Sequence, residues 1–189
     1  MSKELKLKKY EMLRQEILQY LEEYQNVRNM MYIITVILLG FCLTGEKTIV
    51  YAFLLPLVVT IPSHIISYDY WKCVTKAATY LRVFHEKDVK YPCHWETRHN
   101  NFNKIYNFSS KSDYQELPYV ICSCVCIFLY FLNVDYSKCC IFEINAGIVA
   151  IIIVIFIFIK YQGVDADKYM DAWEKIKKDE EKLVGSGNR

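Results

Sequence analysis

Four apolar stretches constrain the fold of this chain more than any other feature of its sequence. They cover residues 30–45, 49–67, 118–133 and 141–159. A helix needs about 20 consecutive apolar residues to cross the hydrocarbon core of a bilayer, and the second and fourth stretches have that length. The first and third are shorter, so each needs apolar flanks or local thinning of the bilayer to cross. We expect an all-α membrane protein with four transmembrane helices, which short connectors join into two hairpins.

Basic residues are distributed very unevenly among the segments between these stretches. Of 23 Lys and Arg residues, 6 lie in 1–29, 8 in 68–117 and 7 in 160–189, whereas the two short connectors hold only Lys47 and Lys138. Loops on the cytoplasmic side of a membrane carry an excess of Lys and Arg. The sequence therefore predicts a multipass protein of the cell inner (plasma) membrane, with both termini and the large central loop in the cytoplasm.

The same pattern predicts the organisation of the chain. We expect a cytoplasmic amphipathic helix at 1–29, a first transmembrane hairpin at 30–67, a cytoplasmic helical region at 68–117, a second transmembrane hairpin at 118–159 and a C-terminal cytoplasmic helix at 160–189. The cytoplasmic helices would form an inner bundle below the spans. Charged residues occur throughout the segment before the first apolar stretch, so no cleavable signal peptide is expected.

An apolar stripe runs along the first cytoplasmic segment with alternating spacings of three and four residues, which is typical of a helical seam. Its members are Tyr10, Leu13, Ile17, Tyr20 and Tyr24, followed by Val27 and Met31. No Gly or Pro interrupts the path from Ser2 to Met31, so one helix should run from the cytoplasm into the first span. Two alternatives remain open for the stripe: packing on the chain's own cytoplasmic helices, or a seam between subunits of a homo-oligomer. Its tyrosines favour a loose bundle over a tight two-stranded coiled coil.

The second span combines two prolines with a group of polar residues. Pro56 and Pro62 each lack a backbone donor, so this helix should bend. A helical stripe continues beyond it to Glu86 and predicts a cytoplasmic stalk. Polar side chains at membrane depth usually face other helices or water. We predict that a polar path is lined by Tyr32, Thr35, Thr60, Ser63 and His64. For His64 the plainer alternative is a hydrogen bond to a neighbouring carbonyl.

The last span and the C-terminal segment have contrasting patterns. Residues 148–159 form an unbroken aliphatic and aromatic run, which favours a helix that faces lipid. After Gly163, a stripe through Ala166, Tyr169, Trp173, Ile176 and Leu183 predicts a third cytoplasmic helix.

The central loop carries the histidines and arginines that could recognise an anionic ligand, and a helix is expected to begin at Pro92. The candidates for binding such a ligand, a nucleotide for example, are Arg82, His85, Arg98 and His99. Cys93 and His94 are metal ligands by type, but they are adjacent and belong to no paired ligand unit. No metal site and no cofactor are expected.

Several functional classes are disfavoured by missing motifs. The chain has no Gly-rich phosphate loop, no Gly-x-Ser-x-Gly elbow and no His-Glu-x-x-His unit, so we expect no catalytic residues. Four-span disulfide oxidases use a Cys-x-x-Cys unit, whereas here only the adjacent pair Cys139 and Cys140 faces the outer side. A net charge of +2 gives little reason to expect direct nucleic-acid binding.

Three runs of sequence carry a family resemblance: Leu54-Leu55-Pro56-Leu57, Tyr80-Leu81-Arg82-Val83-Phe84-His85-Glu86 and Trp95-Glu96-Thr97-Arg98. Over residues 10–110 the chain resembles small bacterial multipass membrane proteins. Some proteins of this build are membrane effectors of antiphage defence, which open or assemble on a nucleotide signal made by a partner enzyme. The resemblance implies a similar role here, and no binding residue is carried over from it.

These patterns together predict an oligomeric channel or membrane-disrupting effector that is gated from its cytoplasmic helices. The basis is a set of short spans with polar residues, a bent second helix and a large amphipathic cytoplasmic surface. The alternative is a non-conducting scaffold or accessory subunit, in which the same stripes bind a cytoplasmic protein partner.

Overall fold

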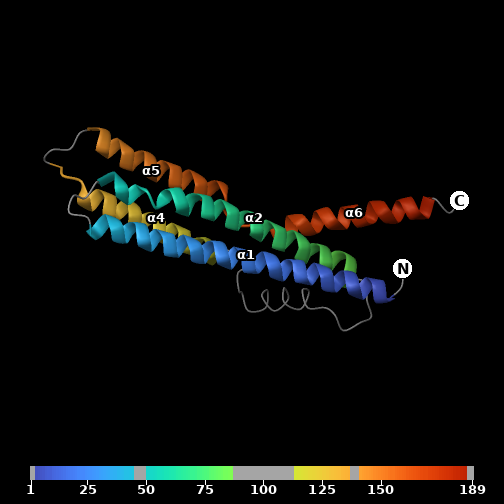
Figure 1. Cartoon of the computed structure of the whole chain (residues 1–189). Helices are drawn as coiled ribbons and strands as arrows, with labels where there is room; N and C mark the ends of the chain where they lie inside the picture. The colour runs from blue at the N-terminus through green and yellow to red at the C-terminus, as the bar shows by residue number, and fades with distance from the viewer. Residues whose placement is uncertain (1–2, 45–49, 87–112, 137–140, 187–189) are drawn as a thin grey trace. The chain divides into compact units, whose positions relative to one another are not determined.

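The fold was derived from a computed structural model, which describes residues 3–44, 50–86, 113–136 and 141–186. Every regular element in these ranges is a helix (Figure 1). The elements are α1 (Lys3–Thr44), the 3-10 helix η1 (Val50–Leu54), α2 (Leu57–Leu81), the π-helical turn η2 (Arg82–Glu86), α4 (Asp113–Asn133), α5 (Ile141–Lys160) and α6 (Ala166–Ser186). The prediction of an all-α chain is therefore confirmed for these residues.

Four helical stretches are long and apolar enough to cross a membrane. They are Leu7–Thr44, Val50–Glu86, Glu116–Asn133 and Ile141–Lys160. Each overlaps one of the four apolar stretches expected to span the bilayer. The chain thus has the length and composition of a multipass membrane protein.

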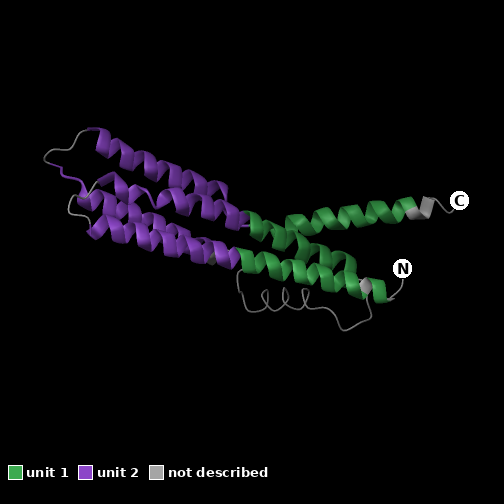
Figure 2. Cartoon of the chain, viewed as in Figure 1, with its two compact units in different colours: residues 1–23, 69–112, 164–189 green, residues 24–68, 113–163 purple. Residues whose placement is uncertain are grey.

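The chain divides into two compact units (Figure 2). Unit 1 comprises residues 1–23, 69–112 and 164–189, and unit 2 comprises residues 24–68 and 113–163. Most of the charged residues fall in unit 1, and the four apolar stretches fall in unit 2. α1 and α2 contribute residues to both units.

The first helix confirms the expected continuity beyond Met31. α1 is a single helix from Lys3 to Thr44, because no proline occurs in this range and its one glycine, Gly40, lies within the last turns. The Thr44 hydroxyl donates a hydrogen bond to the Gly40 carbonyl at 2.9 Å and satisfies one of the carbonyls left open at the helix end.

The two prolines of the second apolar stretch predicted one bent helix. The structure has two helical elements there instead. Residues Val50–Leu54 form a 3-10 helix, and α2 begins only at Leu57. Pro56 lies between them, and its carbonyl oxygen accepts hydrogen bonds from the amides of Val59 and Thr60 at 3.0 and 2.9 Å. Proline suits the first turn of a helix because its missing N–H would have no partner there. Pro56 therefore starts a helix, whereas Pro62 lies inside α2.

Unit 2 is a bundle in which α2 and α4 run antiparallel. Near one end, Phe53 of η1 packs with Tyr130 of α4 and with Val134, which follows α4. At the other end, Ser67 of α2 and Tyr119 of α4 are hydrogen-bonded at 2.6 Å. A cluster between these ends joins Leu57, Cys126 and Val154, and Leu39 of α1 packs against it. All four helices thus share one core.

The surface of α5 is almost entirely apolar. Only Gly147 and Val154 of this helix are buried, and exposed residues include Ile152, Ile155 and Phe156. Gly147 lies so close to the rings of Tyr130 and Phe131 that a Cβ atom would approach Cε1 of each at 2.9 Å. A large exposed apolar face marks an interaction with lipid or protein. The exposed face of α5 is thus open to lipid or to another helix, and its contact with lipid stays a prediction.

In unit 1 the start of α1 packs antiparallel on the second half of α2. Tyr10 and Ile17 are buried against Val74 and Leu81. The Tyr10 hydroxyl donates a hydrogen bond to Glu86 at 3.3 Å. The apolar stripe predicted to extend α2 as far as Glu86 is present and covers α1.

The third predicted amphipathic helix is present as α6. Asp165 caps it, since its carboxylate accepts the amide hydrogens of Asp167 and Lys168 at 3.0 and 3.2 Å. Gly163 precedes the cap with a φ of 40°, a left-handed conformation that glycine adopts without strain. Trp173 packs edge-on against Tyr80 with ring centroids 5.2 Å apart.

Candidate functional site

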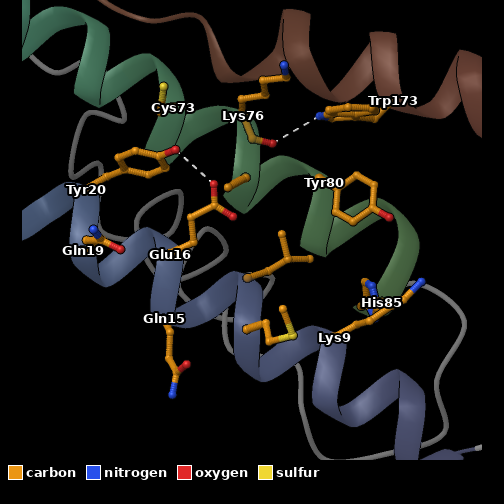
Figure 3. Close-up of a pocket in the computed structure, with 13 residues that line it drawn as sticks. Lys9, Gln15, Glu16, Gln19, Tyr20, Cys73, Lys76, Tyr80, His85 and Trp173 are labelled. Carbon is orange, nitrogen blue, oxygen red and sulfur yellow. Dashed lines mark hydrogen bonds between the residues drawn. The ribbon is translucent and has the colours of Figure 1, made fainter.

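Unit 1 contains a pocket of about 770 Å³ (Figure 3). Its walls come from three helices, and its lining residues are Lys9, Met12, Leu13, Gln15, Glu16, Gln19 and Tyr20 of α1, Cys73, Lys76, Ala77 and Tyr80 of α2, His85 of η2 and Trp173 of α6. Pockets that bind small organic molecules have volumes of roughly 300–1,000 Å³. The pocket therefore has the size for such a ligand.

Three charged side chains line the pocket, those of Lys9, Glu16 and Lys76. Lys9 and His85 lie together at one end in Figure 3, and Glu16 lies toward the other end. The Glu16 carboxylate accepts a hydrogen bond from the Tyr20 hydroxyl at 3.0 Å. Glu16 is the one acidic side chain of the lining, and it accepts this hydrogen bond from within the chain.

An aromatic group forms the wall contributed by α6. The Trp173 indole N–H donates a hydrogen bond to the Lys76 carbonyl at 3.2 Å. The Lys76 ammonium lies 6.0 Å from the centre of the Trp173 ring. Tyr80 stacks on Phe84 at 4.7 Å and meets Trp173 edge-on. These contacts fix the orientation of the indole.

Unit 2 contains a second group of candidate functional residues, which are polar and buried on α2 and α4. Thr60, His64 and Ser67 are buried on α2, and Tyr119 and Ser123 are buried on α4. Spacings of three and four residues put each set on one helix face. Each helix therefore presents a polar stripe within an otherwise apolar unit. We call these five residues the polar face of unit 2.

Some of these groups have hydrogen-bond partners and others do not. Ser67 and Tyr119 bond to each other, and the Thr60 hydroxyl donates to the Pro56 carbonyl at 2.9 Å. Within the part of the chain that the structure describes, His64 Nε2 and Ser123 Oγ are buried with no partner. The imidazole packs on Phe158 at 4.4 Å and lies 5.3 Å from the Tyr119 ring. Leaving a buried polar atom unpaired costs about 1–3 kcal/mol.

Helix geometry puts the two unpaired atoms at a similar height in the bundle. Starting from the Ser67 to Tyr119 bond, His64 is three residues along α2 and Ser123 is four residues along α4. Because the helices are antiparallel, these steps of roughly 4.5 and 6 Å lead in the same direction. The polar face thus extends from the hydrogen bond between Ser67 and Tyr119 to His64 and Ser123.

The predicted polar path is only partly assembled. Thr60 and His64 belong to the polar face, whereas Ser63 is half-buried and Tyr32 is 38% exposed. Thr35 is buried on α1, where its hydroxyl lies 3.8 Å from the Met31 sulfur. Ser67, Tyr119 and Ser123 were not among the residues predicted from the sequence. Their spacing of three or four residues from other polar positions is the signal that would have found them.

Of the four candidate ligand-binding residues, the structure describes Arg82 and His85. His85 lines the pocket, and Arg82 is half-buried in η2 but is no part of the lining. Arg98 and His99 lie outside the described residues, as do Cys93, His94, Cys139 and Cys140. Lys9, Lys76 and Trp173 were missed, because only the packing of three helices brings them to one pocket.

The proposed seam residues are covered within the chain. Tyr10 and Ile17 are buried by α2, and Leu13 and Tyr20 pack against the same cluster. Tyr24 is buried in unit 2, where the Arg28 guanidinium lies 5.5 Å from its ring centre. In the described structure the chain's own helices therefore pack against Tyr10, Leu13, Ile17 and Tyr20. A seam between subunits that used these residues would have to displace α2.

No group of three or more His, Cys, Asp or Glu side chains within the four described ranges is arranged to hold a metal ion. Comparison with known proteins yields no matching family model, no matching curated protein and no matching solved structure.

Proposed function

We propose that this protein is an oligomeric membrane channel, or a membrane-disrupting effector, whose spans are gated by the helices of unit 1. The observation that carries the proposal is the polar face of unit 2, which places His64 and Ser123 inside a bundle with an apolar exterior. Polar residues at membrane depth are expensive, and in membrane proteins they commonly line paths for ions or water.

The described conformation corresponds to the closed state of this proposal. Thr60 is 0% exposed and His64 is 2% exposed, so the polar face is closed to solvent within the bundle. Separating α2 and α4 would expose both polar stripes to a water-filled path. Water would then satisfy the unpaired atoms and offset part of the energy lost in helix contacts.

The topology proposed with this function has both termini and unit 1 in the cytoplasm of the plasma membrane, with the four spans arranged as two hairpins. The distribution of Lys and Arg supports it. α1 and α2 each contribute residues to both units, so a ligand or protein partner on unit 1 can bias the spans if it binds the two states with different affinity. A role in bacterial antiphage defence is proposed only from the resemblance given above.

Flux through proteoliposomes tests the path. The full chain is reconstituted, and proton and potassium flux are compared for wild type, Ser123→Ala, Thr60→Val and His64→Leu. Ser123→Ala is the sharpest variant, because removing an unpaired buried hydroxyl should leave stability unchanged or raise it. We expect it to alter flux severalfold. Thr44→Val is the matched control, since the exposed Thr44 hydroxyl bonds to its own helix.

Two results would refute the proposal. One is a wild-type chain that never conducts, at any oligomeric mass measured in detergent. The other is flux that stays the same in all three variants of the polar face.

The scaffold alternative is favoured by one observation on α6. Ile176 and Leu183 of its apolar stripe are 42% and 72% exposed, so part of this stripe is open to a cytoplasmic protein. In that case Ile176→Ser would abolish partner capture and wild-type liposomes would show no flux.

A further inference from the structure

We propose that the unit 1 pocket binds a small aromatic anion, meaning a planar ring that carries a carboxylate or phosphate group. The inference concerns binding alone and stands whether or not the chain conducts. It rests on three features of the lining: its two lysine ammonium groups, its fixed indole and its single carboxylate, which accepts a hydrogen bond from Tyr20.

Two lysine side chains of the lining could bind the acidic group. Lys9 and Lys76 are exposed, and within the described ranges neither has a carboxylate partner. By contrast Lys72, on the same helix as Lys76, is held by Asp69 at 3.2 Å. An ammonium group that projects into a pocket without a counter-ion is available to an anion, and such charge-assisted hydrogen bonds are the strong ones.

The carboxylate of Glu16 does not cancel this preference. Its oxygen accepts the Tyr20 hydroxyl at 3.0 Å, and Figure 3 places this pair away from Lys9 and His85. The lining therefore holds two ammonium groups, those of Lys9 and Lys76, against the single carboxylate of Glu16. This excess of positive charge favours a ligand that has one acidic group.

The aromatic wall supplies the second half of the specificity. The Trp173 indole is fixed by its bond to the Lys76 carbonyl and by its edge-on contact with Tyr80. A rigid indole offers a flat apolar surface at little entropic cost, and aromatic pairs gain about 0.5–1.5 kcal/mol beyond area burial. Met12, Leu13 and Ala77 extend this apolar surface. A ring with a single acidic substituent matches both parts of the lining.

Binding is measured by ligand-observed fluorine NMR on the full chain in detergent micelles, with empty micelles as the blank. The probes are para-fluorophenyl phosphate and para-fluorobenzoate, with para-fluorobenzamide as the uncharged ring. We expect both anions to bind and the amide to bind at least about tenfold more weakly, because it lacks the charged group. Tighter binding of the phosphate ester would identify phosphate as the preferred acidic group, and tighter binding of the benzoate would identify carboxylate.

The variants separate this pocket from general attraction to a basic surface. Lys9→Gln with Lys76→Gln should weaken anion binding at least about tenfold, and Lys72→Gln should leave it unchanged. Trp173→Leu should weaken both anions equally. Circular dichroism checks that α6 remains helical in that variant, and the lysine variants retain the aromatic wall.

Three results would overturn the assignment. They are equal binding of the amide and the anions, an equal loss in Lys72→Gln, and the absence of any saturable binding above empty micelles. Inorganic phosphate and unfluorinated phenyl phosphate are added in parallel as competitors. If inorganic phosphate displaces the probes at the same concentration as phenyl phosphate, the ring contributes nothing and the aromatic part of the proposal is wrong.

Discussion

The hydrogen bond between Ser67 and Tyr119 gives a quantitative test of how α2 packs on α4. The two hydroxyl oxygens are 2.6 Å apart, and the residues are 2% and 1% exposed. No water competes for such a bond, so both hydroxyl groups depend on each other. Removing either one is predicted to lower the free energy of unfolding, but by different amounts.

The difference follows from what each remaining hydroxyl can reach. In Tyr119→Phe, the Ser67 hydroxyl can turn to a carbonyl of its own helix, so the loss should be about 1 kcal/mol or less. In Ser67→Ala, the Tyr119 hydroxyl is at the end of a long rigid ring and cannot reach its own backbone. It is left unpaired, which costs about 1–3 kcal/mol.

The double variant completes the cycle. Ser67→Ala with Tyr119→Phe leaves no unpaired hydroxyl, so its stability should be no lower than that of Ser67→Ala alone. Unfolding is followed by circular dichroism in mixed micelles as the fraction of denaturing detergent rises. Tyr136→Phe serves as the control, because that exposed hydroxyl bonds to the Phe131 carbonyl at 2.9 Å. Strictly additive losses at Ser67 and Tyr119 would refute the contact.

Three further predictions concern packing and turns. Gly147→Ala should lower stability by about 1–3 kcal/mol, because its Cβ would overlap the Tyr130 and Phe131 rings; a melting temperature equal to wild type would contradict the close approach of α5 to α4. Gly163→Ala should cost about 1–2 kcal/mol for the left-handed φ of 40°, whereas Gly163→Asn should cost less; equal thermal stability of both variants would contradict the turn. Asp165→Ala should remove the cap of α6 and cost about 1 kcal/mol, measured as a loss of helical circular dichroism on heating, and Asp165→Ser should restore it.

The candidate sites divide into residues that pattern alone identified and residues that it could not. Thr60 and His64 were identified because polar side chains in an apolar run stand out. Ser67, Tyr119 and Ser123 required knowledge of which face of α4 meets α2. Similarly His85 was named from its chemistry, whereas Lys9 and Trp173 lie 164 positions apart and reach one pocket only through the packing of α1, α2 and α6.

The sequence by itself determined the helical class, the four apolar stretches and the amphipathic stripes, because hydrophobic period and length are local properties of a chain. It also predicted α1 as one helix and α6 after Gly163. It could not decide that Pro56 starts α2, since a proline can either bend a helix or begin one. Only the tertiary structure decided that α2 covers the Tyr10 to Tyr20 stripe and that His64 packs on Phe158 of α5 and near Tyr119 of α4, because partner choice depends on which faces fit together in space.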